Sequence, residues 1–143
     1  MIVCWKVIEY TPVLKIKYNI IYMSKIVGTY KTTGKFSLIT DDKQIRVGDS
    51  NGSTVIISKI EKGIYKYEET FEDERIIGTG FGFLRDDAIE FVAVSTRDDG
   101  TTVSLSVKVM ALECDRHPSS RQIVINVFNY TENVAVFLIG KKI

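Results

Sequence analysis

The stretch that decides the fold is Arg75-Ile76-Ile77-Gly78-Thr79-Gly80-Phe81-Gly82-Phe83-Leu84. Its three glycines lie two residues apart, and the side chains of a β-strand point alternately to opposite faces. One face of this predicted strand is therefore bare, while the other carries Thr79, Phe81 and Phe83. Glycines on one strand face indicate a sharply curved wall, the close approach of another backbone, or an aromatic ring lying across the gap. We favour the curved wall of a barrel.

The segment that follows predicts a β-hairpin. Asp99-Gly100 separates two runs of alternating apolar residues, which is typical of a two-residue type I′ turn. A turn of this length places Val94 opposite Leu105 and Val92 opposite Val107. The apolar residues of the two strands therefore meet on one face of the predicted sheet.

The turn that precedes this hairpin indicates which face is the core. An even-length turn at Asp86-Asp87 puts Phe81 and Phe83 on the side of the apolar pairs. We therefore expect the face with Phe, Val and Leu to be the core. The opposite face carries the glycines, Ala93 and Ser104, and we expect it to face solvent or to accept a close contact.

Length and composition predict a single intracellular domain. A chain of 143 residues can bury a hydrophobic core without the help of disulfides or metal ions. The 19 Lys and Arg residues nearly balance the 18 Asp and Glu residues, so we expect no nucleic-acid partner and no anionic membrane surface. Cys4 and Cys114 are too few for a disulfide framework. Reduced thiols and a cytoplasmic location are therefore expected.

Residues 1–23 are predicted to be an N-terminal extension, and residues 24–143 a single β-barrel domain. In the extension, apolar residues alternate with charged ones, so it contains neither a membrane span nor a signal core. Met23 leaves open the alternative that residues 1–22 lie upstream of the natural start. If the segment is native, it is a candidate for adding strands to a sheet edge or to a neighbouring chain.

From Ser24 onward, short apolar runs alternate with turn residues, and no window of about 11 residues keeps the apolar stripe of a helix. The predicted fold class is all-β, an antiparallel meander of about eight to ten strands closed into a barrel, with a β-sandwich as the alternative. The expected strands are Ile26–Thr33, Phe36–Thr40, Gln44–Val47, Thr54–Ile60, Ile64–Phe71, Arg75–Leu84, Ala88–Arg97, Thr101–Glu113, Arg121–Tyr130 and Val134–Ile139.

Three short motifs resemble those of a known group. Gly28-Thr29-Tyr30 in the first strand, with Gly63-Ile64-Tyr65 and Gly78-Thr79-Gly80 further along, is similar to the calycin group of lipocalins, avidins and fatty-acid-binding proteins. The pattern extends over residues 26–139. The resemblance implies an up-and-down barrel that holds a small ligand, with an aromatic residue of the first motif packed across the bottom. Tyr30 stands where those families have a tryptophan, and no binding residue is carried over.

As a binding module, the barrel would hold a small amphipathic or apolar molecule in its mouth or interior. Tyr65 and Tyr67, with Phe71, form an aromatic stripe on one face of a predicted strand. An ordinary packed core would use the same residues, and this alternative stays open. The candidate ligand-binding residues are Tyr30, Tyr65, Tyr67, Phe81 and Phe83.

The alternative function is that of a structural or protein-interaction protein, such as a viral accessory protein. It would form a homo-oligomer through a strand edge or through the Gly/Ala/Ser face. Chemistry-bearing clusters are scarce, so we assign no catalytic residue, no cofactor and no metal, and an enzymatic role ranks last. Cys114 and His117 are weak metal candidates with the spacing C-x-x-H, and turn residues before Pro118 are the simpler interpretation.

Overall fold

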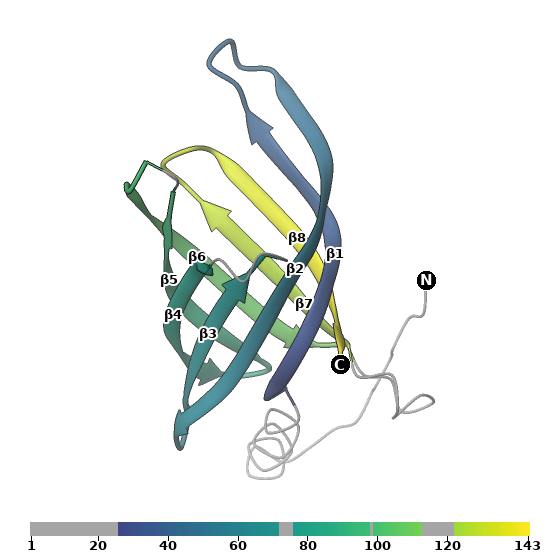
Figure 1. Ribbon diagram of the computed structural model, residues 1–143, viewed down its shortest axis with the longest axis vertical. Helices are drawn as coiled ribbons and strands as arrows, with labels where there is room; N and C mark the ends of the chain where they lie inside the picture. The colour runs from purple at the N-terminus through teal and green to yellow at the C-terminus, as the bar shows by residue number, and fades with distance from the viewer. Residues whose placement is uncertain (1–25, 72–75, 98, 113–121) are drawn as a thin grey trace.

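The computed structural model describes residues 26–71, 76–97, 99–112 and 122–143. Their eight strands form a closed antiparallel barrel in which each strand pairs with its sequence neighbours and β8 returns to β1 (Figure 1). The predicted all-β barrel is confirmed, and the sandwich alternative is wrong. The strands are β1 (Gly28–Ile39), β2 (Ile45–Glu61), β3 (Ile64–Thr70), β4 (Ile76–Arg85), β5 (Ala88–Thr96), β6 (Thr102–Ala111), β7 (Gln122–Asn129) and β8 (Val134–Lys142).

The expected breaks between strands at Thr33-Gly34 and Asn51-Gly52, where glycine suggested turns, are wrong, because β1 and β2 continue through both. The two segments lie opposite each other, and Gly34 pairs with Ser50. The pairing register shifts at this level, and Gly52 adopts a φ of 87°, as is typical of a glycine in a β-bulge. The four short strands expected here are therefore two long ones, whose hairpin extends beyond the rest of the barrel (Figure 1).

The prediction that Phe81 and Phe83 face the core is also wrong. Their side chains are 60% and 62% exposed on the outer face of β4, whereas the three glycines of this strand are buried. Val92 and Val94 of β5 point outward as well. The Phe residues of β4 and the Val residues of β5 therefore lie on the same face of the sheet, as predicted. That face is the outer one, although it was expected to be the core.

The length of the β5–β6 loop explains this inversion. The Arg97 nitrogen donates to the Thr101 oxygen at 2.8 Å, and the Gly100 nitrogen donates to the Arg97 oxygen at 2.9 Å. Three residues therefore connect the strands instead of two, and Gly100 has a φ of 83°. Leu105 consequently pairs with Ala93, one position away from the predicted register. A shift of one residue exchanges the two faces of a strand, so Leu105 points into the barrel.

The glycines of β4 make room for aromatic rings inside the barrel. Tyr67 of β3 pairs with Gly80, and its ring lies 5.4 Å from the ring of Phe91, at an angle of 47°. A Cβ atom added at Gly82 would come within 2.7 Å of Phe91 Cδ1, and one added at Gly80 would overlap the carbonyl oxygen of Val92. The interior holds these two rings because β4 contributes no side chain there.

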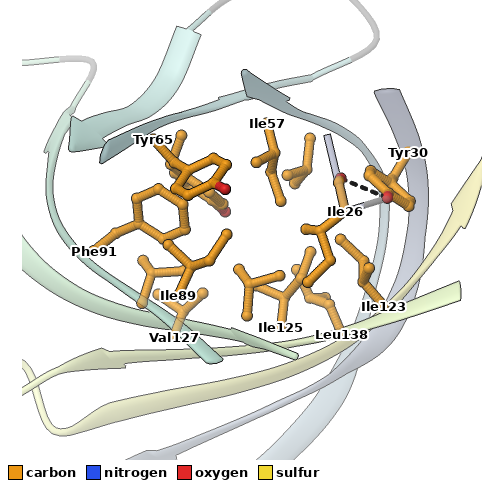
Figure 2. Close-up of a cluster of buried hydrophobic side chains, with 14 of the residues drawn as sticks. Ile26, Tyr30, Ile57, Tyr65, Ile89, Phe91, Ile123, Ile125, Val127 and Leu138 are labelled. Carbon is orange, nitrogen blue, oxygen red and sulfur yellow. Dashed lines mark hydrogen bonds between the residues drawn. The ribbon is translucent and has the colours of Figure 1, made fainter. Parts of the chain in front are cut away.

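The end of the barrel at which β1 begins is a packed core (Figure 2). Ile26, just before β1, is buried in it, and the Tyr30 hydroxyl donates to the Ile26 oxygen at 2.6 Å. Tyr30 of the first motif is thus buried in this end of the barrel. The largest fully buried side chains are those of Ile26, Tyr30, Val55, Ile57, Tyr67, Ile89, Phe91, Val107, Ile123, Ile125 and Leu138.

The substitution Gly80→Ala is expected to lower the free energy of unfolding by about 1–3 kcal/mol, because the new methyl group overlaps main-chain atoms of β5. Gly78→Ala is the matched control, since the nearest atoms to a Cβ there are 3.9 and 4.0 Å away. It should stay within about 1 kcal/mol of the parent. Urea unfolding followed by circular dichroism measures both, and equal losses would contradict the described packing.

Candidate functional site: a cavity at the barrel mouth

The opposite end of the barrel holds a cavity of about 650 Å³. This volume lies within the range of about 300–1,000 Å³ that is usual for small-molecule sites. The β5–β6 and β7–β8 connections border its opening, and the β1–β2 hairpin rises beyond it (Figure 1). Apolar side chains form most of the wall. Those of the described residues are Phe71, Ile77, Val103, Leu105, Val127, Val134, Val136 and Leu138.

A carboxylate lies among these apolar walls. Glu69 of β3 lines the cavity, and the Tyr67 hydroxyl donates to its Oε1 atom at 3.2 Å. The Ser53 side chain makes a second hydrogen bond to this carboxylate. The Ser53 hydroxyl is itself hydrogen-bonded to the hydroxyl of Thr32, and both residues are buried. In the described part of the chain, the groups that donate hydrogen bonds to the carboxylate are therefore neutral hydroxyls.

The surroundings shift the ionisation of this pair of side chains. Burial raises the pKa of the Glu69 carboxyl, and the hydrogen bonds from Ser53 and Tyr67 act in the opposite direction. Burial, together with the neighbouring carboxylate, holds the pKa of the Tyr67 hydroxyl well above its ordinary value. Among the described residues, no Lys or Arg side chain forms an ion pair with Glu69. Its charge is balanced by no cation of this part of the chain.

Other charged side chains lie at the rim of the cavity. Arg97 of the β5–β6 loop forms an ion pair with Glu132 of the β7–β8 turn and so links the two connections. The Glu132 nitrogen donates to the Asn129 side-chain oxygen at 3.2 Å, and the Thr101 nitrogen donates to the Asp99 carboxylate at 2.9 Å. These bonds hold the rim in place. The described lining carries three carboxylates and one guanidinium, so it is acidic.

None of the five candidate ligand-binding residues lines this cavity. Tyr30, Tyr65 and Tyr67 are buried inside the barrel, as a core or lining role requires, but they belong to its packed part. Phe81 and Phe83 lie on the outer surface and cannot reach a molecule held inside. Direct contact of the three tyrosines with a ligand stays a prediction.

Sequence reasoning missed Glu69, although a signal for it was present. Alternation along β3 places it on the same face as Tyr65 and Tyr67, and Phe71 continues that face into the cavity. In the sequence, Glu69 is therefore a charged residue on a strand face that is otherwise aromatic. The remaining lining residues come from strands whose register depends on loop lengths, so only the structure brings them together.

The weak metal candidates Cys114 and His117 lie outside the described residues, as does the predicted extension 1–23. In the part of the chain that is described, no group of three or more His, Cys, Asp or Glu side chains is placed to hold a metal ion. The described strands and turns also include no helix that is long and apolar enough to cross a membrane.

Comparison with known proteins adds no assignment to this geometry. The chain matches no family model, and no curated protein matches it. Any function must therefore be inferred from the cavity and from the surface of the barrel.

The substitution Glu69→Gln is expected to stabilise the protein above neutral pH. Because the folded state holds this proton more tightly than the unfolded chain does, the carboxyl favours folding at low pH, and that contribution is lost as the pH rises through its raised folded-state pKa. The variant lacks this loss, so its melting temperature should exceed that of the parent at pH 8, and the difference should shrink towards about pH 4.

The matched control for this experiment is Glu68→Gln. Glu68 is the preceding residue on β3 and lies on the outer face. Its Oε2 atom is 3.6 Å from Lys66 Nζ. Thermal unfolding across the pH range compares the three proteins. A Glu69→Gln variant that is less stable than the parent at pH 8 would show that the carboxylate is not strained by burial.

Proposed function

We propose that this protein is a non-enzymatic binding module that holds a small amphipathic or apolar molecule in the cavity at the barrel mouth. The observation that carries this proposal is a volume of about 650 Å³ with mostly apolar walls at one end of a barrel whose other end is densely packed. A concave volume of this size at the mouth of a small barrel is a common form of small-molecule site.

The calycin resemblance supports the proposal. That group combines an up-and-down barrel and a packed bottom with a ligand inside, and this chain has an eight-stranded barrel of the same connectivity with Tyr30 in the packed end. We extend the resemblance to a shared mode of ligand binding. Kinship with the calycins is part of the proposal.

A neutral, environment-sensitive dye tests the proposal directly. N-phenyl-1-naphthylamine should bind with a saturable rise in fluorescence and a stoichiometry of one per chain, because the cavity offers an apolar wall and no neutral dye is repelled by Glu69. Val103→Trp places a large ring in the cavity and should abolish the signal. Ser104→Trp adds the same ring on the outer face of β6 and should leave it unchanged. Equal binding by both variants would place the dye elsewhere.

A second candidate function is self-association through the edge of β2. Residues 45–50 of β2 pair only with β1, because the described pairing with β3 begins at Thr54. Ile45 and Val47 on this overhanging segment are 73% and 67% exposed. An unpaired strand edge with apolar side chains is a template for pairing with another chain. These observations favour a homo-oligomer built on the β1–β2 hairpin.

The other surface considered for assembly, the Gly/Ala/Ser face, is not available in full. The β4 glycines and Ala93 of β5 are buried inside the barrel, so they cannot contact another subunit. Ser104 and Ser106 of β6 do lie outside. The structure thus corrects the face as it was expected from the sequence and leaves the strand edge as the favoured route.

Val47→Lys is expected to shift a dimer towards monomer, because it places a charge on the edge that would be paired. Val92→Lys is the control, since Val92 is equally exposed on the outer face of β5, away from the hairpin. Sedimentation velocity over a concentration series reports the subunit number. A parent protein that stays monomeric at the highest concentration would remove this second candidate.

A further inference from the structure

The two walls of the mouth cavity differ in chemistry. Glu69 projects from β3, with Ser53 of the neighbouring β2 beside it. Val127 of β7 and the β8 residues Val136 and Leu138 form an apolar surface. In a closed barrel of eight strands, β3 and β7 are four strands apart in either direction, so these two surfaces face each other. An occupant therefore meets a carboxylate on one side, with Phe71 beyond it, and an apolar surface on the other.

The carboxylate has unused capacity for hydrogen bonds. An ionised carboxylate offers about four acceptor positions. The described residues supply two donors to Glu69, the hydroxyls of Tyr67 and Ser53. Among the described residues no cation pairs with it, and a charge in an apolar setting is costly unless it is paired. A donor on the occupant, and a cation most of all, would complete this site.

An anionic head group finds no comparable site. Arg97 is the one cation among the described lining residues, and it is already paired with Glu132 at the rim. A ligand carboxylate placed at the polar wall would lie against Glu69 and raise the free energy of both charges. The described lining, with its excess of carboxylates, therefore selects against fatty-acid-like molecules.

We propose that the cavity takes an amphipathic amine, whose protonated amino group binds Glu69 and whose hydrocarbon body lies against the apolar wall of β7 and β8. This inference rests on the proposed function, since it names the class of ligand for the same cavity. The ammonium group supplies up to three donors and a positive charge, which match a carboxylate that has two donors and no cationic partner among the described residues.

A head-group series tests the inference on the full chain. Octylamine, octanol and octanoate share one hydrocarbon body, and each is titrated against bound N-phenyl-1-naphthylamine. Octylamine should displace the dye at concentrations at least about tenfold lower than octanol does, a difference of about 1.4 kcal/mol. Octanoate should be the weakest of the three. This ranking is measured in the parent protein and does not depend on any variant.

Glu69→Gln and Glu68→Gln provide the matched pair of variants. The first removes the charge inside the cavity while keeping the size of the side chain, so octylamine should lose its advantage over octanol. The second removes one charge from the outer face of the same strand and should keep the advantage. A preference for octylamine that survives in Glu69→Gln would overturn the assignment of Glu69 as the amine site.

Acidification gives a further readout. Among the described residues, the other charged groups that line the cavity are Arg97 and Asp99 near the β5–β6 loop and Glu132 at the β7–β8 turn. Tyr67 of β3 does not line the cavity, but its hydroxyl contacts Glu69. The remaining strands contribute none among the described lining residues. As Glu69 becomes protonated towards about pH 4, octylamine binding should weaken more than octanol binding in the parent but not in Glu69→Gln.

The possible outcomes separate this inference from the proposed function. If the dye and octanol bind but octylamine has no advantage, or octanoate binds best, the barrel is a binding module and the amine assignment is wrong. If neither the dye nor any octyl compound binds, the proposed function itself fails. Tenfold preference for octylamine that disappears only in Glu69→Gln would establish both.

Discussion

The limited width of a closed eight-stranded barrel is the constraint on which the rest of the structure depends. Such a barrel has an interior just large enough for side chains to fill, so the face of each strand that points inward is decisive. Here the middle of β4 gives Gly78, Gly80 and Gly82 to the inside, and the rings of Tyr67 and Phe91 occupy the space this leaves. Gly80 is pressed against the main chain of β5. The glycines of β4 thus allow both the close approach of β5 and the packing of the two rings inside the closed barrel.

The same constraint divides the interior into two parts. Towards the start of β1, large aliphatic and aromatic side chains fill the barrel, and Tyr30 is anchored to Ile26 by a hydrogen bond (Figure 2). Towards the mouth, the inward side chains are smaller or polar, such as Ser53 and Val103, and they leave the cavity open. One half is densely packed, and the half that is incompletely filled contains the cavity. Rigid support of this kind lets a polar group such as Glu69 keep a fixed position.

The sequence predicts the barrel architecture but not which face of each strand points into the barrel. Alternating apolar residues and turn chemistry identify the strands from β3 to β8, because those signals are local, but they divide β1 and β2 into four short strands. The inward face was assigned wrongly because it depends on whether the β5–β6 loop has two or three residues, and Asp99-Gly100 is compatible with both. Likewise, Asn51-Gly52 resembles a turn although it forms a bulge. The cavity depends on register across several strands, so only its Glu69 left a trace in the pattern.

The three-residue connection between Arg97 and Thr101 has a consequence for how this chain tolerates insertions and deletions. In a hairpin, the number of loop residues determines which alternate side chains of the following strand point into the barrel. Removing one residue from it would present Ser104 and Ser106 to the core and expel Leu105 and Val107 into water. Length changes of two residues would preserve the alternation. Variation at this loop should therefore occur in steps of two.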